Sequence, residues 1–304
     1  MFDTILHVAL LLLFPPLVVG VVQKTKAVFA GREGAPVLQP YFDLAKLMRK
    51  GAVYSRTTTW LFRAGPIVAL AAALGAGLFV PLASSRAPIG FEGDVIAVAY
   101  LLGLGRFFTM AAALDTGSSF EGMGASREAA FAALAEPALF LAFAIVCVPA
   151  GSASFADAWR ALPWRMWLEA HPELFAAALV LFAVLLAENS RMPVDDPNTH
   201  LELTMIHEVM VLDHSGPDLA FVLWASAVKL FVFAGLLVHL VLPIPAGWRG
   251  AGLFLIGLSV VALVVGIVES MMARLRLTRV PQFLVGASVL GAMGLLVALM
   301  ERAG

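Results

Sequence analysis

The stretch from Ala187 to Asp218 holds most of the side chains in this sequence that could carry proton or charge chemistry. Its sequence is AENSRMPVDDPNTHLELTMIHEVMVLDHSGPD, in a chain otherwise dominated by apolar runs. The stretch begins while an apolar run is still in progress, so Glu188 and Arg191 should lie at the mouth of a membrane helix. Ionisable groups at the edge of a bilayer are costly, and they line a cavity, a path or a protein interface.

A short helix is predicted in the second half of this stretch. Thr199 and Glu202 have the spacing of a capping box, which predicts a helix that starts there and runs to about Leu212. On such a helix His200 and His207 would lie on nearly one face. An apolar stripe would allow the helix to pack on another element, and its members are Leu203, Ile206 and Met210.

The histidines of this helix do not have the spacing of a zinc site. A zinc-binding helix places two His four residues apart with Glu directly after the first. Here His207-Glu208 is followed at the second His position by Val211. We therefore predict no metal ligands. A solvated polar face, a protein interface and a point of proton uptake remain as alternatives for this helix.

Charged residues also lie inside the predicted membrane spans, where each costs about 2.5–3.5 kcal/mol on insertion scales. One alternative is structural pairing, such as Glu136 with Arg106 or Lys229. The other is a proton path, which Arg106 cannot serve because an arginine does not deprotonate. We predict a polar track from the loop toward the middle of the bilayer, and no catalytic residue. The track candidates are Glu136, Glu188, His200, Glu202, Lys229, His239 and Glu269.

The elements that must position these residues are membrane helices. The chain has 304 residues, of which 61% are hydrophobic and 13% charged, about half the charged fraction of a soluble domain. Several runs reach the roughly 20 apolar residues that cross a bilayer. We predict an all-α, polytopic integral membrane protein, with residues 1–304 forming a single membrane domain. About eight spans are predicted: Thr4–Val22, Ala64–Ala83, Val95–Leu114, Ala129–Val148, Leu174–Ala187, Leu219–Leu242, Ala251–Val268 and Phe283–Met300.

Basic residues are distributed unequally between the loops. The odd-numbered loops hold twelve Lys and Arg residues, and the even-numbered loops hold four. The positive-inside rule therefore predicts cytoplasmic odd loops and both termini outside, with the first apolar run retained as a helix. The predicted cytoplasmic loops are 23–58, 115–127, 189–218 and 271–280.

Composition also narrows the function. No Lys/Arg run carries the aromatic residues of a nucleic-acid surface, so we expect the lipid bilayer and no nucleic acid as a partner. Cys147 is the only cysteine, which excludes an intramolecular disulfide and a cysteine-held cluster. An autonomous transporter is disfavoured because the sequence shows no repeat with paired broken helices.

Four segments together resemble one family. They are GREGAPVLQPYFDLAKL, LDTGSSFEGMGASREAAF with AEP, the stretch from Ala187, and ESMMARLRLTR. They are similar to the membrane subunit that anchors the hydrogenase module in formate hydrogenlyase and related energy-converting nickel–iron hydrogenases. That membrane protein is related to the quinone-chamber subunit of respiratory complex I.

The resemblance implies a complex I subunit 1-like bundle in the bacterial inner membrane. It implies a role that seats soluble electron-transfer subunits and couples their redox chemistry to proton or sodium movement. The implied partners are hydrogenase-like large and small subunits, an iron–sulfur protein and antiporter-like membrane subunits. Nickel–iron and iron–sulfur centres are implied in those partners, and no cofactor in this chain.

The alternative is a quinone-binding subunit of a complex I-like dehydrogenase. The quinone family has a loop pattern like PFDLxExExEL, which Pro193, Asp195 and Glu202 match. Asn198 and His200 replace two of its acids, which favours the hydrogenase branch.

The resemblance also implies a docking surface for the soluble module. The loops Gln23–Thr58, Asp115–Arg127 and Asn189–Asp218 should form one cytoplasmic face, with the mixed charge of a partly polar interface. The candidate interface residues are Arg32, Asp43, Asp115, Glu121, Arg127, Arg191, Asp195, Asp196, Glu208 and Asp213.

Overall fold

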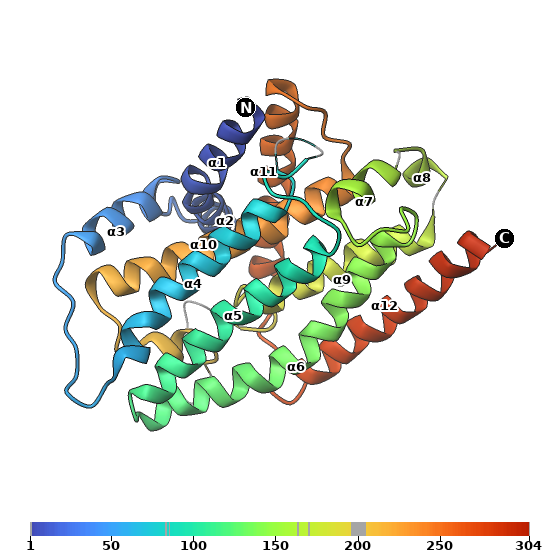
Figure 1. Cartoon of the computed structure of the whole chain (residues 1–304). Helices are drawn as coiled ribbons and strands as arrows, with labels where there is room; N and C mark the ends of the chain where they lie inside the picture. Colours follow the sequence, from blue (N-terminus) through green and yellow to red (C-terminus); the bar gives the residue numbers. More distant parts are fainter. Residues whose placement is uncertain are drawn as a thin grey trace.

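The computed structural model describes residues 2–82, 84, 86–162, 164–169, 171–195 and 205–303. In these ranges the chain is helical and carries no strand. Figure 1 shows α4 (Trp60–Phe79), α5 (Asp94–Asp115), α6 (Ser119–Cys147) and α12 (Val280–Ala303) inclined in the same direction. An α-helix satisfies its own backbone hydrogen bonds, which makes it one of the two structures that can span lipid.

Six of the described helices are long and apolar enough to cross a membrane. They are α4, α5, α6, α10 (Gly216–Val241), α11 (Trp248–Met271) and α12. The helices α1 (Phe2–Leu13) and α2 (Pro15–Phe29) are bent by 48° and count as a seventh if they form one span. The bend falls at Pro15-Pro16, because proline lacks the N–H that would continue the helical hydrogen bonds.

The remaining predicted span falls on α9 (Pro172–Glu188), which has 17 residues, the lower end of the length that crosses a bilayer. The all-helical membrane fold is therefore confirmed, while the count of eight is approximate. The short helices α3 (Gln39–Met48), α7 (Phe155–Ala161) and α8 (Trp164–Leu168) lie in the connections. Figure 1 shows α3 at one end of the bundle, and α7 and α8 at the other.

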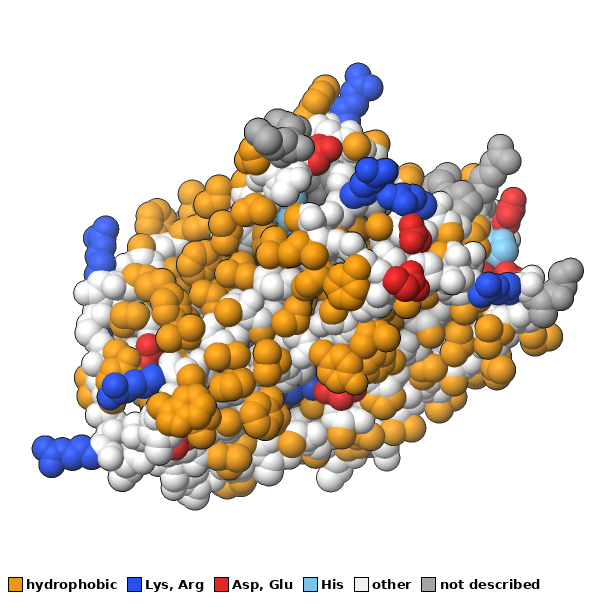
Figure 2. Space-filling view, in the orientation of Figure 1, with side chains coloured by type: hydrophobic (Ala, Val, Ile, Leu, Met, Phe, Trp, Pro, Cys, Tyr) orange, Lys and Arg blue, Asp and Glu red, His pale blue; other side chains and the backbone are white. Residues whose placement is uncertain are grey.

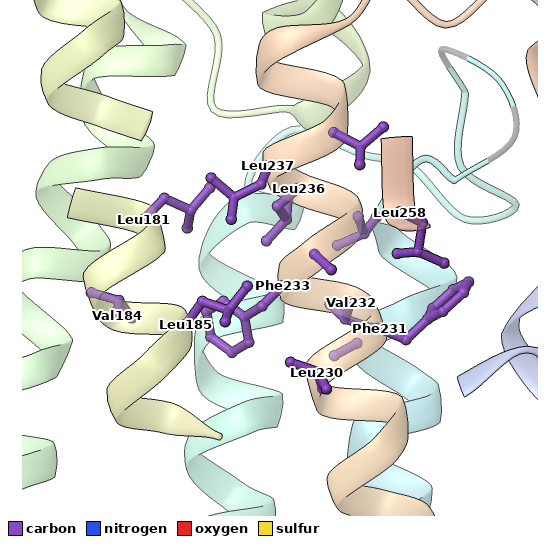
Figure 3. Packing of buried hydrophobic residues seen from close by; sticks show 14 of the residues in the cluster. Leu181, Val184, Leu185, Leu230, Phe231, Val232, Phe233, Leu236, Leu237 and Leu258 are labelled. Atoms are coloured by element: carbon purple, nitrogen blue, oxygen red, sulfur yellow. The ribbon is translucent and has the colours of Figure 1, made fainter. Parts of the chain in front are cut away.

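The core is built around α10, the most buried of the six candidate spans. Figure 3 shows Phe233 and Leu237 of α10 facing Leu181 and Leu185 of α9, and all four side chains are buried. Small residues allow other helices to approach closely. A Cβ added to Gly65 of α4 would lie 2.7 Å from the Cβ of Ala112 on α5. Hydrophobic side chains cover much of the outer flank (Figure 2), as a lipid-facing surface requires.

Two predicted local structures are wrong. The segment 115–127 is not a loop, because α6 already begins at Ser119 and only residues 116–118 connect it to α5. The first loop is also shorter than predicted, because α2 continues to Phe29. The glycines of segment 115–127 belong to the packing surface: a Cβ on Gly124 would lie 2.3 Å from Cγ1 of Val209.

The predicted helix from Thr199 to Leu212 is wrong in its described part. Residues 205–207 are not helical, and only the 3₁₀ helix η1 (Glu208–Val211) follows. The backbone N–H groups of Ile206 and His207 donate to the Asp195 carboxylate, at 3.3 and 3.2 Å, and this holds the segment to a distant side chain. Ile206 and Met210 of the predicted stripe are buried. Thr199, Asn198 and Leu203 lie outside the described residues.

Candidate functional site

Arg106 of α5 lies at the centre of a group of carboxylates from two other helices. Its guanidinium contacts Glu136 of α6 at 2.8 Å, Glu188 of α9 at 2.5 Å and Glu128 of α6 at 3.4 Å, each through a different nitrogen. Lys229 of α10 contacts the second oxygen of Glu188 at 3.0 Å. We call these five residues the buried ion cluster. It joins four helices, and a fork-shaped guanidinium is suited to bridging several carboxylates.

Helical spacing explains how α6 supplies two of the acids. Glu128 and Glu136 are eight residues apart, a little over two helical turns, so both point to the same side of α6. Glu128 is 6% exposed, whereas the side chain of Glu136 is 50% exposed. The pairing of Glu136 with Arg106, one of the two alternatives drawn from the sequence, is therefore present. Glu136 also keeps an exposed side from which a proton could arrive or leave.

His207 connects the buried ion cluster to the loop before α10. Its Nε2 lies 3.1 Å from Glu128, and its Nδ1 lies 3.5 Å from Asp195. Burial alone would lower the pKa of His207, but the carboxylates of Glu128 and Asp195 outweigh it and raise that pKa to about 9. His207 is therefore an imidazolium at neutral pH, and it continues the chain of alternating charges outward.

Asp195 is the next member of this chain. Its Oδ1 lies 2.9 Å from the guanidinium of Arg274, and its side chain is only 2% exposed. Burial raises the pKa of Asp195, and the contacts with His207 and Arg274 outweigh that effect, so the pKa lies below its usual value. The charged groups run without interruption from Arg274 through Asp195, His207 and Glu128 to Arg106.

A cavity of about 780 Å³ borders the buried ion cluster. Its polar wall includes Arg106, Glu128, Glu188, His207 and Lys229, and its apolar wall includes Ala69, Leu101, Leu102, Val222 and Leu223. A volume of 300–1,000 Å³ with a mainly apolar wall and a few convergent polar groups is typical of small-molecule sites. The cavity can therefore hold water beside the charged groups, or the apolar part of a ligand.

Glu269 of α11 forms a second buried ion group at the same cavity. Its carboxylate lies 2.9 Å from Nζ of Lys26 on α2 and 3.3 Å from the Arg191 guanidinium. Lys26 and Arg191 both line the cavity. The cavity therefore joins the two groups, although no direct ion pair between them is found among the described residues.

His239 does not lie beside the other track candidates. It follows Lys229 by ten positions on α10, about 15 Å along the helix axis. Its Nε2 hydrogen-bonds the Leu82 carbonyl at 2.8 Å, and its ring stacks on Trp159 at 5.9 Å. The single track predicted from the loop to His239 is therefore interrupted after Lys229. His200 and Glu202, the remaining track candidates, lie outside the described residues.

The predicted docking residues divide into exposed and buried sets. Arg32, Asp43 and Asp213 are exposed. Asp115 is half-buried, and its carboxylate accepts hydrogen bonds from N and Oγ1 of Thr59 at the start of α4. Arg127 and Glu208 are half-buried, and Arg127 donates to the Met205 carbonyl at 2.9 Å. Asp196 lies outside the described residues.

Three of the docking residues are wrongly placed on the surface by the sequence prediction. Glu121 is 0% exposed and accepts from the backbone N–H of Asp213, Asp195 is buried against Arg274, and Arg191 is buried against Glu269. Each carboxylate or guanidinium has an internal partner, which makes burial of the charge tolerable. Charge in a polar loop does not reveal which side chains turn inward.

Sequence reasoning missed Glu128 and the bridging role of His207. Glu128 directly precedes the predicted span Ala129–Val148, and its position beside a span does not single it out. Its spacing of eight from Glu136 is the signal that could have found it, because it puts both acids on one helical face. The role of His207 depends on Asp195 and Glu128 approaching from 12 and 79 residues away, which no local pattern contains.

These features define a class: a polytopic helical membrane protein with a buried, multi-helix ion cluster beside a large cavity. Family comparison agrees with this class, because the model of the NADH dehydrogenase family, NADHdh, matches residues 2–300. The chain belongs to the NADH dehydrogenase family. The predicted resemblance is therefore confirmed.

Curated relatives include hydrogenase subunits. Formate hydrogenlyase subunit 4 of Escherichia coli (strain K12) is 30% identical over 275 residues, which cover 88% of each chain. Hydrogenase-4 component C of the same strain is 33% identical over 236 residues, covering 77% of this chain and 73% of the relative. A membrane subunit of the NADH-quinone oxidoreductase of Anaplasma phagocytophilum (strain HZ) is 27% identical over 230 residues, covering 70% and 64%.

A solved structure has the same fold. A chain of the membrane-bound sulfane sulfur reductase (MBS), an archaeal respiratory membrane complex, superposes with a TM-score of 0.85. The match covers 98% of both chains at 22% identity. The relatives are named as subunits or components, so this chain is a multi-pass membrane subunit of a larger complex.

Proposed function

We propose that this chain is the membrane subunit of an energy-converting, formate hydrogenlyase-like hydrogenase complex. It seats the soluble electron-transfer and hydrogenase module and couples the redox chemistry of that module to proton or sodium translocation. The two E. coli hydrogenase relatives support the proposal. The partners are hydrogenase-like large and small subunits, an iron–sulfur protein and antiporter-like membrane subunits. The nickel–iron and iron–sulfur centres belong to those partners, since this chain has a single cysteine.

One observation carries the coupling role. The ion chain from Arg274 and Asp195 through His207 and Glu128 reaches Arg106, which contacts Glu136 and Glu188 between the helices. Groups that alternate in charge at about 3 to 3.5 Å interact strongly, and more so where solvent is excluded. A charge change at the outer end of the chain would therefore alter the proton affinity of the inner groups.

Glu136→Gln tests the coupling. The amide keeps the shape of the side chain and its contact with Arg106, but it cannot titrate. We expect electron transfer to persist while ion pumping is lost, because half-exposed Glu136 is the member best placed to exchange a proton. Hydrogen evolution and dye-reported pumping are measured together, with the complex reconstituted in vesicles.

The matched control for this test is Glu33→Gln, which removes an exposed carboxylate from the first loop. Both activities should remain normal in that variant. Normal pumping in a well-assembled Glu136→Gln complex would remove Glu136 from the path and leave its contact with Arg106 as a structural pair.

The alternative function is a quinone-binding subunit of a complex I-like dehydrogenase. The specific observation in its favour is the cavity of about 780 Å³, whose apolar wall could hold an isoprenoid tail. A protein named as part of an NADH-quinone oxidoreductase is among the relatives. The discriminating measurement is electron transfer to a soluble quinone analogue by the purified complex. Quinone reduction that is lost in Leu101→Trp, which fills the cavity, would favour this alternative.

The orientation in the membrane is a further part of the proposal. The excess of basic residues in the odd loops supports an inner-membrane protein with periplasmic termini. In a Cys147→Ala background, Asp157→Cys should react with an impermeant thiol reagent in intact cells, whereas Arg49→Cys should react only after permeabilisation. Both native side chains are exposed. Labelling of Arg49→Cys from outside would reverse the orientation.

A further inference from the structure

A second polar cluster lies far from the buried ion cluster, where α9 begins and α12 ends. His171 directly precedes α9, Glu173 lies in its first turn, and Glu301 lies in the last turn of α12. His171 is 17 positions from Glu188, about 25 Å along α9, so the two clusters are separate. Figure 2 shows acidic side chains and a histidine gathered at the end of the molecule where Figure 1 places the C-terminus.

Two carboxylates converge on one nitrogen of His171. Its Nδ1 lies 2.9 Å from Oε1 of Glu173 and 2.8 Å from Oε2 of Glu301. A ring nitrogen carries at most one hydrogen, so it can fully satisfy only one of these oxygens. The three ligand atoms all lie within 4.8 Å of one another. An arrangement of two anionic oxygens and one nitrogen around a common point is better matched to a cation than to a single proton.

Glu173 supplies an independent observation. Its side chain is 2% exposed, and its second oxygen, Oε2, is buried without a hydrogen-bond partner among the described residues. An ionised carboxylate is costly to bury unless its oxygens are paired or coordinate a metal. Glu169 adds a further negative charge 3.5 Å from Nε2 of His171. The neighbouring cation, Arg302, directs its guanidinium to the Val148 carbonyl at 3.1 Å.

We propose that His171, Glu173 and Glu301 bind a divalent cation of the Zn²⁺ class, which ties the start of α9 to the end of α12. Zinc accepts imidazole nitrogen together with carboxylate oxygen, whereas Mg²⁺ and Ca²⁺ prefer oxygen ligands alone. Zinc bonds of about 2.0 Å set tetrahedral ligand atoms about 3.3 Å apart, so the three atoms need to separate by only a few tenths of an ångström. A water molecule fills the fourth position. This inference does not rest on the proposed function.

The helix packing gives the site its rigidity. A Cβ added to Gly294 of α12 would lie 2.8 Å from the Cβ of Ala176 on α9, so the two helices are in close contact one to two turns from the site. Glu301 is seven positions beyond Gly294, and Glu173 is three positions before Ala176. The close contact therefore holds residues that are 130 positions apart at a fixed separation.

The test is zinc binding by the detergent-purified native complex. The complex is stripped with a chelator, equilibrated with ZnCl₂ and desalted, and zinc per chain is measured by mass spectrometry. We expect wild type to hold one more zinc per chain than Glu301→Gln or His171→Gln, whose zinc affinity should fall at least tenfold. Glu301 is 41% exposed, so its replacement should leave assembly intact. Asp157→Asn, which removes an exposed carboxylate from α7, should bind zinc like wild type.

X-ray absorption at the zinc edge provides the second measurement. The wild-type zinc should have one nitrogen and otherwise oxygen ligands at about 2.0–2.2 Å. Zinc bound to the metal-containing partner subunits would be the same in every variant, so only the difference between variants is informative. Equal zinc content and affinity in wild type, Glu301→Gln and His171→Gln would overturn the proposal, as would a sulfur-ligated zinc.

Discussion

Arg106→Gln is expected to prevent accumulation of the chain in membranes. The substitution leaves Glu128, Glu136 and Glu188 with Lys229 as the remaining cation of the buried ion cluster. Removing one partner from a buried ion pair costs about 3–5 kcal/mol, because the uncompensated charge stays buried. That cost is comparable to a large part of the stability of an ordinary domain. Immunoblots of membranes and the apparent Tm of the solubilised complex measure the effect.

Two further variants separate charge from geometry. Arg106→Lys keeps the positive charge but loses the fork that reaches three carboxylates through three nitrogens, so it should accumulate at an intermediate level. Arg249→Gln removes an exposed arginine at the start of α11 and should accumulate normally. If Arg106→Gln accumulates like Arg249→Gln with an unchanged Tm, the cluster does not stabilise the fold.

The second expected result is a loss of stability at alkaline pH that depends on His207. Its pKa rises from about 6.5 to about 9 on folding. A raised pKa gives stability that is fully present below pH 6.5 and is lost as the pH rises through 9. At about 1.36 kcal/mol per unit, the contribution is on the order of 3 kcal/mol. The apparent Tm of wild type should therefore fall between about pH 7 and 9.5.

His207→Gln should have a lower Tm than wild type at about pH 7 and a flatter profile above it. His214 provides a control with the opposite sign. Burial lowers the pKa of His214, whose ring stacks on Phe62 at 4.0 Å, so its contribution is lost as the pH falls below 6.5. His214→Gln should therefore leave the alkaline slope intact. An alkaline slope in His207→Gln equal to that of wild type would show that His207 is not held charged by Glu128 and Asp195.

These two predictions concern one continuous structure. Glu128 contacts both Arg106 and His207, so a proton lost from His207 changes the charge beside the buried ion cluster. Contacting groups of one network are expected to show non-additive effects. The proposed coupling would use this dependence: a charge change in the loop alters the groups between the helices.

The sequence by itself determined the class of the protein and its helical elements. The apolar runs predicted the eight segments that became helices, because a hydrocarbon environment demands long apolar stretches and internal backbone hydrogen bonds. Four motifs together also identified the family. The pairing of Arg106 with Glu136 was available as an alternative, since two opposite charges inside spans have few tolerable environments.

The tertiary structure alone decided which charged residues meet. Hydropathy and helical period are local properties, whereas Arg106, Glu128 and Glu188 are brought together by helices that are distant in sequence. Asp195 was expected on a docking surface and lies inside, because Arg274 and His207 approach it from other segments. The residues near Ile206 were expected to be helical, and the Asp195 carboxylate binds their N–H groups instead. Close approach at small residues such as Gly124 sets these distances, and packing of this kind depends on both partners at once.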